Sequence, residues 1–370
     1  MNQYRRLIWV AVGVFLAAGA GAQTTLKEVF KNDFRIGAAL NLREFTGENS
    51  NADKIITEQF NTISPEDVLK WESVHPLPGQ FNFSRADRYV DFGRKHKMFI
   101  VGHNLIWHQQ TPPWVFMDDH GNLVDRDTLL QRMQEHISTV VGRYRDEIGG
   151  WDVVNEALNE DGTLRNSLWR KIIGDDYLIK AYQFAHAADP HAELYYNDYS
   201  LENLPKRNGA VALIKKLQAA GIHLTAIGLQ EHDNLKWPAT NEVDATISTF
   251  SGLGLKVMIT ELDLDVLPAA TPSHGAEVSL KVDPQAELNP YTNELPDSVQ
   301  QKLAQRYADL FSVFMKHRES ISRVTFWGVT DADSWLNNWP VSGRTSYPLL
   351  FDRNFQPKPA FNAVIATAHE

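Results

Sequence analysis

The chain has 370 residues, a hydrophobic content of 43% and a formal net charge of −10. This composition allows a large buried core, and the absence of cysteine excludes disulfides, thiolate metal sites and cysteine nucleophiles. The net negative charge argues against nucleic acid as a partner. The sequence also has no block of basic residues and no basic stripe interleaved with aromatic residues. Because no repeat, low-complexity segment or Pro/Ser linker interrupts the sequence, we expect one domain over residues 23–370.

The first element in the chain is a predicted signal peptide over residues 1–22. Arg5 and Arg6 supply the positive start, residues 7–18 form an apolar run, and residues 20–22 (AGA) are a small-residue cleavage site. The run is too short for a comfortable membrane span, although an N-terminal anchor is the alternative interpretation. We therefore expect a secreted or periplasmic bacterial protein that has no contact with the membrane once the signal is removed.

Short apolar runs then alternate with amphipathic stretches along the chain. The runs that predict buried strands cover residues 34–40, 60–63, 98–105, 150–154, 193–197, 226–229, 257–260 and 323–328. Helices are predicted over 84–97, with Ser84 as the N-cap, and over 126–145, 203–220, 298–317 and 358–368. Eight predicted strands that alternate with helical stretches indicate an α/β protein. We therefore predict a single (β/α)8 TIM barrel with its cleft at the C-terminal face of the strands. A doubly wound sheet is the rival fold, but no Gly-rich phosphate loop follows the first strand.

One connection in this pattern is long. Residues 267–296 separate the seventh predicted strand from its helix and contain prolines at 268, 272, 284, 290 and 296. A loop of this size in a compact domain is usually a functional lid or passes over a site.

Two of the predicted strands end in a glutamate. Glu156 follows the fourth apolar run and Glu261 follows the seventh. In an α/β barrel the C-terminal ends of the strands form the rim where catalytic groups lie, and two carboxylates on one rim are the minimum for cleaving a glycosidic bond. The alternative is that both are surface acids at strand ends. Polar and aromatic residues also follow most of the other strands, at 66–72, 102–108, 197–199, 228–232 and 326–335, which predicts a long polar cleft.

Several of these segments together resemble glycoside hydrolase family 10, the retaining endo-1,4-β-xylanases. They are 102–108 (GHNLIWH), 151–156 (WDVVNE), 259–263 (ITELD), 327–335 (WGVTDADSW), 343–352 (GRTSYPLLFD) and 357–359 (PKP). The resemblance extends from about residue 34 to residue 361. It implies a TIM-barrel xylanase that acts on xylan and xylo-oligosaccharides, with Glu156 as acid/base and Glu261 as nucleophile.

The resemblance also implies roles for neighbouring residues. His232 matches the histidine that keeps the nucleophile ionised, with Asp263 orienting it, and Asn155 matches the group that binds the 2-hydroxyl, although a helix cap is its alternative role. Sugar-binding positions are matched by Glu66, Asp67, Lys70, His103 and Gln230, and aromatic walls by Trp107, Trp327 and Trp335. Of the last three, Trp335 is expected to restrict room beside the sugar C5, which excludes hexoses.

The sequence departs from the family pattern at three positions, Asp67, Asn104 and Glu231, where an Asn, a Thr and a small residue are usual. We expect these three changes to affect how tightly individual subsites bind sugar, and not the reaction that is catalysed. No His-Glu-x-x-His motif is present, so we expect neither a metal nor another cofactor. The remaining alternatives are the same mechanism acting on cellulose or β-glucan, and a catalytically inactive xylan-binding barrel. We expect the protein to be a monomer.

Overall fold

The computed structural model describes residues 24–271 and 278–368. The predicted signal peptide, residues 1–22, lies outside the described residues. Across the two described ranges, we find no helix that combines the length and the apolar character needed to cross a membrane.

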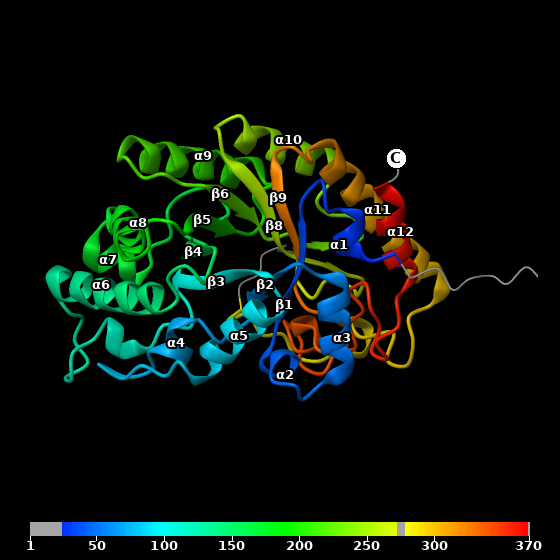
Figure 1. The fold of residues 1–370 in the computed structure, drawn as a ribbon, viewed down its shortest axis with the longest axis horizontal. Coiled ribbons are helices and arrows are strands. Elements are labelled where there is room, and N and C mark those ends of the chain that lie inside the picture. Colours follow the sequence, from blue (N-terminus) through cyan, green and yellow to red (C-terminus); the bar gives the residue numbers. More distant parts are fainter. Residues whose placement is uncertain (1–23, 272–277, 369–370) are drawn as a thin grey trace, which may run out of the picture.

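A closed, all-parallel barrel of eight strands forms the centre of the domain (Figure 1), which confirms the predicted fold class. Its strands are β1 (Arg35–Leu40), β2 (Thr62–Pro65), β3 (Phe99–Ile106), β4 (Gly150–Asn155), β5 (Glu193–Asp198), β6 (Ala226–Leu229), β8 (Lys256–Asp265) and β9 (Ile321–Phe326). Pairing of β1 with β9 and of β6 with β8 closes the sheet. The strands are almost entirely buried, because the helices cover their outer side and side chains fill the interior.

A ninth strand, β7 (His232–Asn234), was not predicted. It is short and polar, and it pairs with the outer part of β8, where His232 lies opposite Asp263. Three residues carry no apolar periodicity, so the sequence gives no strand signal there. The pairing carries His232 onto the C-terminal end of the barrel.

Helices surround the barrel (Figure 1). The longer ones are α3 (Ser50–Gln59), α5 (Ser84–Lys95), α6 (Arg126–Arg143), α8 (Tyr177–Ala188), α9 (Leu204–Ala219), α10 (Thr240–Ser251), α11 (Asp297–Lys316) and α12 (Pro359–Thr367). Shorter ones are α1 (Leu26–Val29), α2 (Leu42–Phe45), α4 (Trp71–Val74) and α7 (Leu168–Ile173), with 3-10 turns at Pro113–Val115, Ala286–Leu288 and Trp335–Asn337. The predicted N-cap at Ser84 is wrong. Ser84 is the first helical residue and its hydroxyl donates to the Asn82 side chain, which competes with a capping bond.

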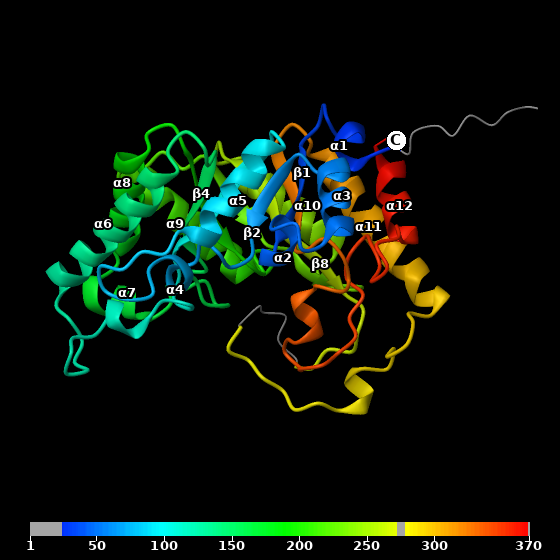
Figure 2. The ribbon, with the colours of Figure 1, turned by 60° about the horizontal axis from the view of Figure 1, so that its bottom comes forward.

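The connections after β8 and β9 project from the same end of the barrel (Figure 2). The first of them is the long connection expected from the sequence, and its only regular element in the described part is the turn Ala286–Leu288. Val278 of this connection lines the same pocket as Glu156 and Glu261. The described part of the connection therefore borders this pocket at Val278.

Candidate active site

The twelve predicted site residues all line one pocket at the C-terminal ends of the strands. They are Glu66, Asp67, Lys70, His103, Trp107, Asn155, Glu156, Gln230, His232, Glu261, Trp327 and Trp335. The pocket also includes Gln110 and Val278, which the sequence analysis did not select. Both come from irregular segments, where no periodic pattern indicates the direction of a side chain.

Glu156 lies where the chain turns after β4, in a left-handed backbone conformation with φ of 54°. This conformation is uncommon for a residue with a side chain and is found disproportionately at functional sites. The Glu156 carboxyl accepts hydrogen bonds from Trp107 Nε1 at 2.7 Å and from Gln230 Nε2 at 3.0 Å. It is 4% exposed, so these two donors take the place of water.

Burial is the main cause that raises the pKa of Glu156 to about 7, and the negative charge of Asp198 adds to it. The hydrogen bonds from Gln230 and Trp107 act in the opposite direction, because they stabilise the carboxylate. At neutral pH a large fraction of Glu156 therefore carries a proton. This is the state that a general acid requires.

Glu261 lies within β8 and has a different environment. Its Oε2 is 3.1 Å from His232 Nε2, and its Oε1 accepts a hydrogen bond of 2.7 Å from Asn197 Nδ2. Burial alone would raise the pKa of Glu261, but the His232 bond, the charges of His103 and His232, and the Asn197 bond outweigh it and lower the pKa. Glu261 is therefore ionised when Glu156 is still largely protonated.

His232 connects two carboxylates of β8, those of Glu261 and Asp263. Its Nδ1 lies 3.0 Å from Asp263 Oδ1, while its Nε2 faces Glu261. Burial opposes the charged imidazolium, but Asp263 and Glu261 outweigh burial and raise the pKa of His232 to about 10. The ring is thus protonated on both nitrogens at neutral pH and donates to both carboxylates.

An amide network links the two glutamates. Asn197 Nδ2 donates to Asn155 Oδ1 at 2.9 Å as well as to Glu261, and Asn155 Nδ2 donates to Glu156 at 3.3 Å. Asn197 was noted in the sequence only as part of a polar segment after the fifth strand, with no assigned role. Its contacts depend on three strands meeting at the barrel end, which a single-strand pattern does not report.

Charged groups form one wall of the pocket. Lys70 is buried, and its Nζ pairs with Asp67 Oδ1 at 2.9 Å and lies 5.2 Å from the Trp107 ring centroid. Burial, followed by the charge of Asp67, raises the pKa of Glu66 to about 7, while Lys70 opposes them. His103 Nδ1 lies 2.9 Å from Asp152 Oδ2, which fixes its ring orientation.

Two further tryptophans, Trp327 and Trp335, also line the pocket. Trp327 meets the His103 ring edge-on at a centroid distance of 5.5 Å. Trp335 Nε1 donates to Asp263 Oδ2 at 2.7 Å, so Asp263 holds both Trp335 and His232. Within residues 24–271 and 278–368, no group of three or more His, Asp or Glu side chains is arranged to hold a metal ion.

A parallel barrel that presents one largely protonated and one ionised glutamate in a pocket bordered by tryptophans has the architecture of a glycoside hydrolase. Comparison with known proteins agrees. The glycosyl hydrolase family 10 profile matches residues 25–367. The chain therefore belongs to glycosyl hydrolase family 10, and the prediction of an enzyme of the endo-1,4-β-xylanase class is confirmed at the level of the family.

Individual relatives support the same assignment. Endo-1,4-beta-xylanase A of Xylanibacter ruminicola is 43% identical over 364 residues, which cover 98% of this chain and 99% of the relative. The structure of an endoxylanase of this family retrieved from sugarcane soil metagenome has a TM-score of 0.89 at 43% identity, covering 92% of this chain and 99% of the other. A mutant structure in complex with xylotriose has a TM-score of 0.84 at 36% identity, and the match covers 92% of this chain and 99% of the other.

Proposed function

We propose that the protein is an endo-1,4-β-xylanase that hydrolyses internal bonds of xylan by double displacement, with Glu261 as nucleophile and Glu156 as acid/base. The observation that carries this proposal is the opposite shift of the two pKa values within one pocket, raised to about 7 for Glu156 and lowered for Glu261. Two carboxyls with different protonation states are what the first step requires.

In the first step, a carboxylate oxygen of Glu261 attacks the anomeric carbon while the bond from that carbon to the leaving oxygen breaks. Glu156 transfers its proton to the leaving oxygen, so the departing chain leaves as a neutral alcohol. The product is a covalent ester between the glycone and Glu261. His232 and Asn197, which donate to the two Glu261 oxygens, hold this carboxylate in a fixed orientation before the attack.

In the second step, Glu156 is ionised and accepts a proton from water, and the water oxygen attacks the anomeric carbon. The ester bond to Glu261 breaks, and both glutamates return to their starting protonation states. Two inversions give net retention. Trp107 and Gln230 stabilise the ionised form of Glu156 that exists between the steps, because both are hydrogen-bond donors.

The surrounding residues bind the sugar in this proposal. Lys70, His103 and Gln230 contact hydroxyls at the cleavage point, Asn155 binds the 2-hydroxyl, and Glu66 and Asp67 act further along the glycone side. Trp107, Trp327 and Trp335 provide apolar faces for the sugar rings. We further propose that residues 1–22 direct export and are removed, and that the mature protein is monomeric. N-terminal sequencing and light scattering of the exported protein test these two statements.

The substrate is tested with the purified enzyme on glucuronoxylan and on carboxymethylcellulose. We expect rapid loss of xylan viscosity with xylo-oligosaccharide products, and little release of reducing ends from carboxymethylcellulose. Faster hydrolysis of carboxymethylcellulose would favour the β-glucan alternative. Binding to xylan without release of reducing ends would favour the inactive barrel.

A further inference from the structure

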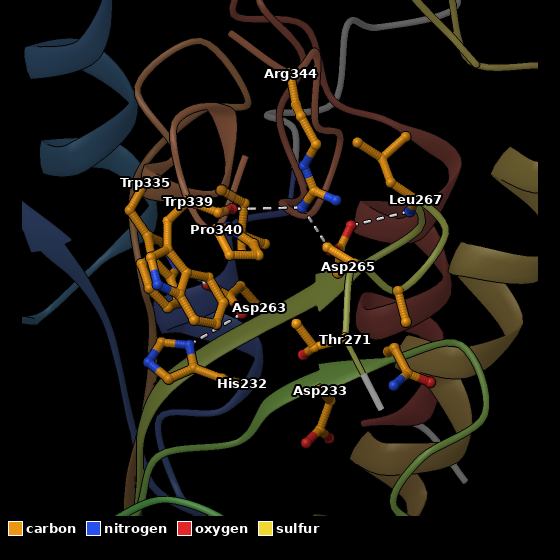
Figure 3. A pocket seen from close by; sticks show the side chains of 14 residues that line it. His232, Asp233, Asp263, Asp265, Leu267, Thr271, Trp335, Trp339, Pro340 and Arg344 are labelled. Atoms are coloured by element: carbon orange, nitrogen blue, oxygen red, sulfur yellow. Dashed lines mark hydrogen bonds and ion pairs between the residues drawn. The ribbon is translucent and has the colours of Figure 1, made fainter. Parts of the chain in front are cut away.

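Strand β8 carries three carboxylates at every second position, Glu261, Asp263 and Asp265. Because side chains alternate along a strand, these three point to the same side of the sheet. Glu261 and Asp263 hold His232 between them. Asp265 has no part in the chemistry described above, yet it lines the pocket shown in Figure 3, which adjoins the catalytic pocket.

Trp335 and His232 line both of these pockets. The Trp335 indole is bonded to Asp263 through Nε1, and its ring lies 4.8 Å from the His232 ring by centroid distance. Trp339 stacks on it with centroids 4.4 Å apart and planes 18° apart (Figure 3). Trp335 is thus a partition between two spaces, and Trp339 is its stacking partner.

Trp339 is itself tied to the strand that carries the nucleophile. Arg344 Nη2 donates to Asp265 Oδ2 at 2.8 Å and to the Trp339 carbonyl oxygen at 3.4 Å (Figure 3). The Arg344 side chain is 1% exposed, so this ion pair is screened little by solvent. Asp265 Oδ1 also accepts the backbone N–H of Leu267, which fixes the carboxylate from a second direction.

We propose that Trp339 determines substrate specificity by holding Trp335 against the sugar-binding side of the partition, with Asp265 and Arg344 anchoring it. The hydrogen bond to Asp263 fixes only the Nε1 edge of Trp335. Without the stacked ring, the rest of the indole can tilt toward the adjoining pocket, and the catalytic pocket gains room for the hydroxymethyl group of a hexose. The proposal rests on the proposed xylanase function.

The test compares kcat/KM for an aryl β-cellobioside with kcat/KM for an aryl β-xylobioside. Trp339→Ala should raise the cellobioside-to-xylobioside ratio by about tenfold, the range that one added or removed steric contact commonly gives. Trp339→Phe keeps an aromatic face against Trp335 and should return most of the original ratio. Trp114→Ala is the matched control, because Trp114 lines neither pocket and its indole bonds to the Pro76 carbonyl.

A ratio in Trp339→Ala that equals the ratio in the Trp114→Ala control would overturn the proposal, since a general loss of stability lowers both activities together. The proposal would also be overturned if Trp339→Phe raised the cellobioside-to-xylobioside ratio as much as Trp339→Ala does, because the stacked aromatic face would then be irrelevant. An unmodified protein that fails to cleave the xylobioside would instead refute the proposed function. The two failures are therefore distinguishable.

Discussion

Replacing Trp107 by Phe should raise the pKa of Glu156 and move the alkaline limit of activity upward. Trp107 Nε1 donates to Glu156 Oε2 at 2.7 Å, and this donor stabilises the carboxylate more than the neutral acid. Phe keeps an apolar ring beside Lys70 but has no N–H. The general acid therefore keeps its proton to a higher pH, and activity persists to a higher pH.

The expected rise in the pKa of Glu156 can be worked out from the energy of the lost hydrogen bond. A hydrogen bond to a charged group contributes about 1.5–3 kcal/mol, and one pKa unit corresponds to about 1.4 kcal/mol. The protonated carboxyl retains part of the interaction, because its carbonyl oxygen still accepts from the indole. Gln230 also continues to donate at 3.0 Å. We therefore expect an increase of about one unit above the starting value of about 7.

The assay is kcat/KM for an unbranched xylo-oligosaccharide as a function of pH, which reports the ionisations of the free enzyme. Trp114→Phe is the control, since it removes an indole N–H that donates to the Pro76 carbonyl and to no titrating group. An alkaline limit that stays in place or moves downward in Trp107→Phe, with the control unchanged, would refute the reasoning.

The remaining predictions concern three other residues of the pocket. His232→Gln removes the cation that lowers the pKa of Glu261, so the acid limit of the kcat/KM profile should move to higher pH, and an unmoved acid limit would argue against this role. Trp335→Ala should raise the ratio of aryl cellobioside to aryl xylobioside activity by about tenfold; an unchanged ratio would contradict the steric account. Asp67→Asn should leave kcat on linear xylo-oligosaccharides within a few-fold, because Asp67 is largely exposed, and should improve kcat/KM for glucuronate-bearing oligosaccharides by removing a negative charge. If the ratio of kcat/KM for branched to linear oligosaccharides were the same in both proteins, Asp67 would carry no such specificity.

The barrel could be predicted because most of its strands contain a buried apolar run followed by polar residues, as at Glu156 after β4. Glu261 follows such a run too, but β8 continues past it to Asp265. The same feature placed the predicted site residues on one rim. What the sequence did not reveal depends on contacts between distant segments. Asn197 reaches Glu261 across 64 positions, and Arg344 reaches Asp265 across 79. Local signals failed where side-chain bonds competed with them, as at Ser84.

The central claim is the division of roles between Glu156 and Glu261, and azide rescue of their alanine variants tests it most directly. With an aryl β-xylobioside whose leaving group needs no protonation, Glu156→Ala should form the covalent intermediate at a substantial rate but hydrolyse it slowly. Azide should then accelerate turnover and give the β-configured xylobiosyl azide, detectable by NMR. Glu261→Ala should give no β-azide, because it cannot form the intermediate. A β-azide product from Glu261→Ala, with none from Glu156→Ala, would reverse the assignment and contradict the account.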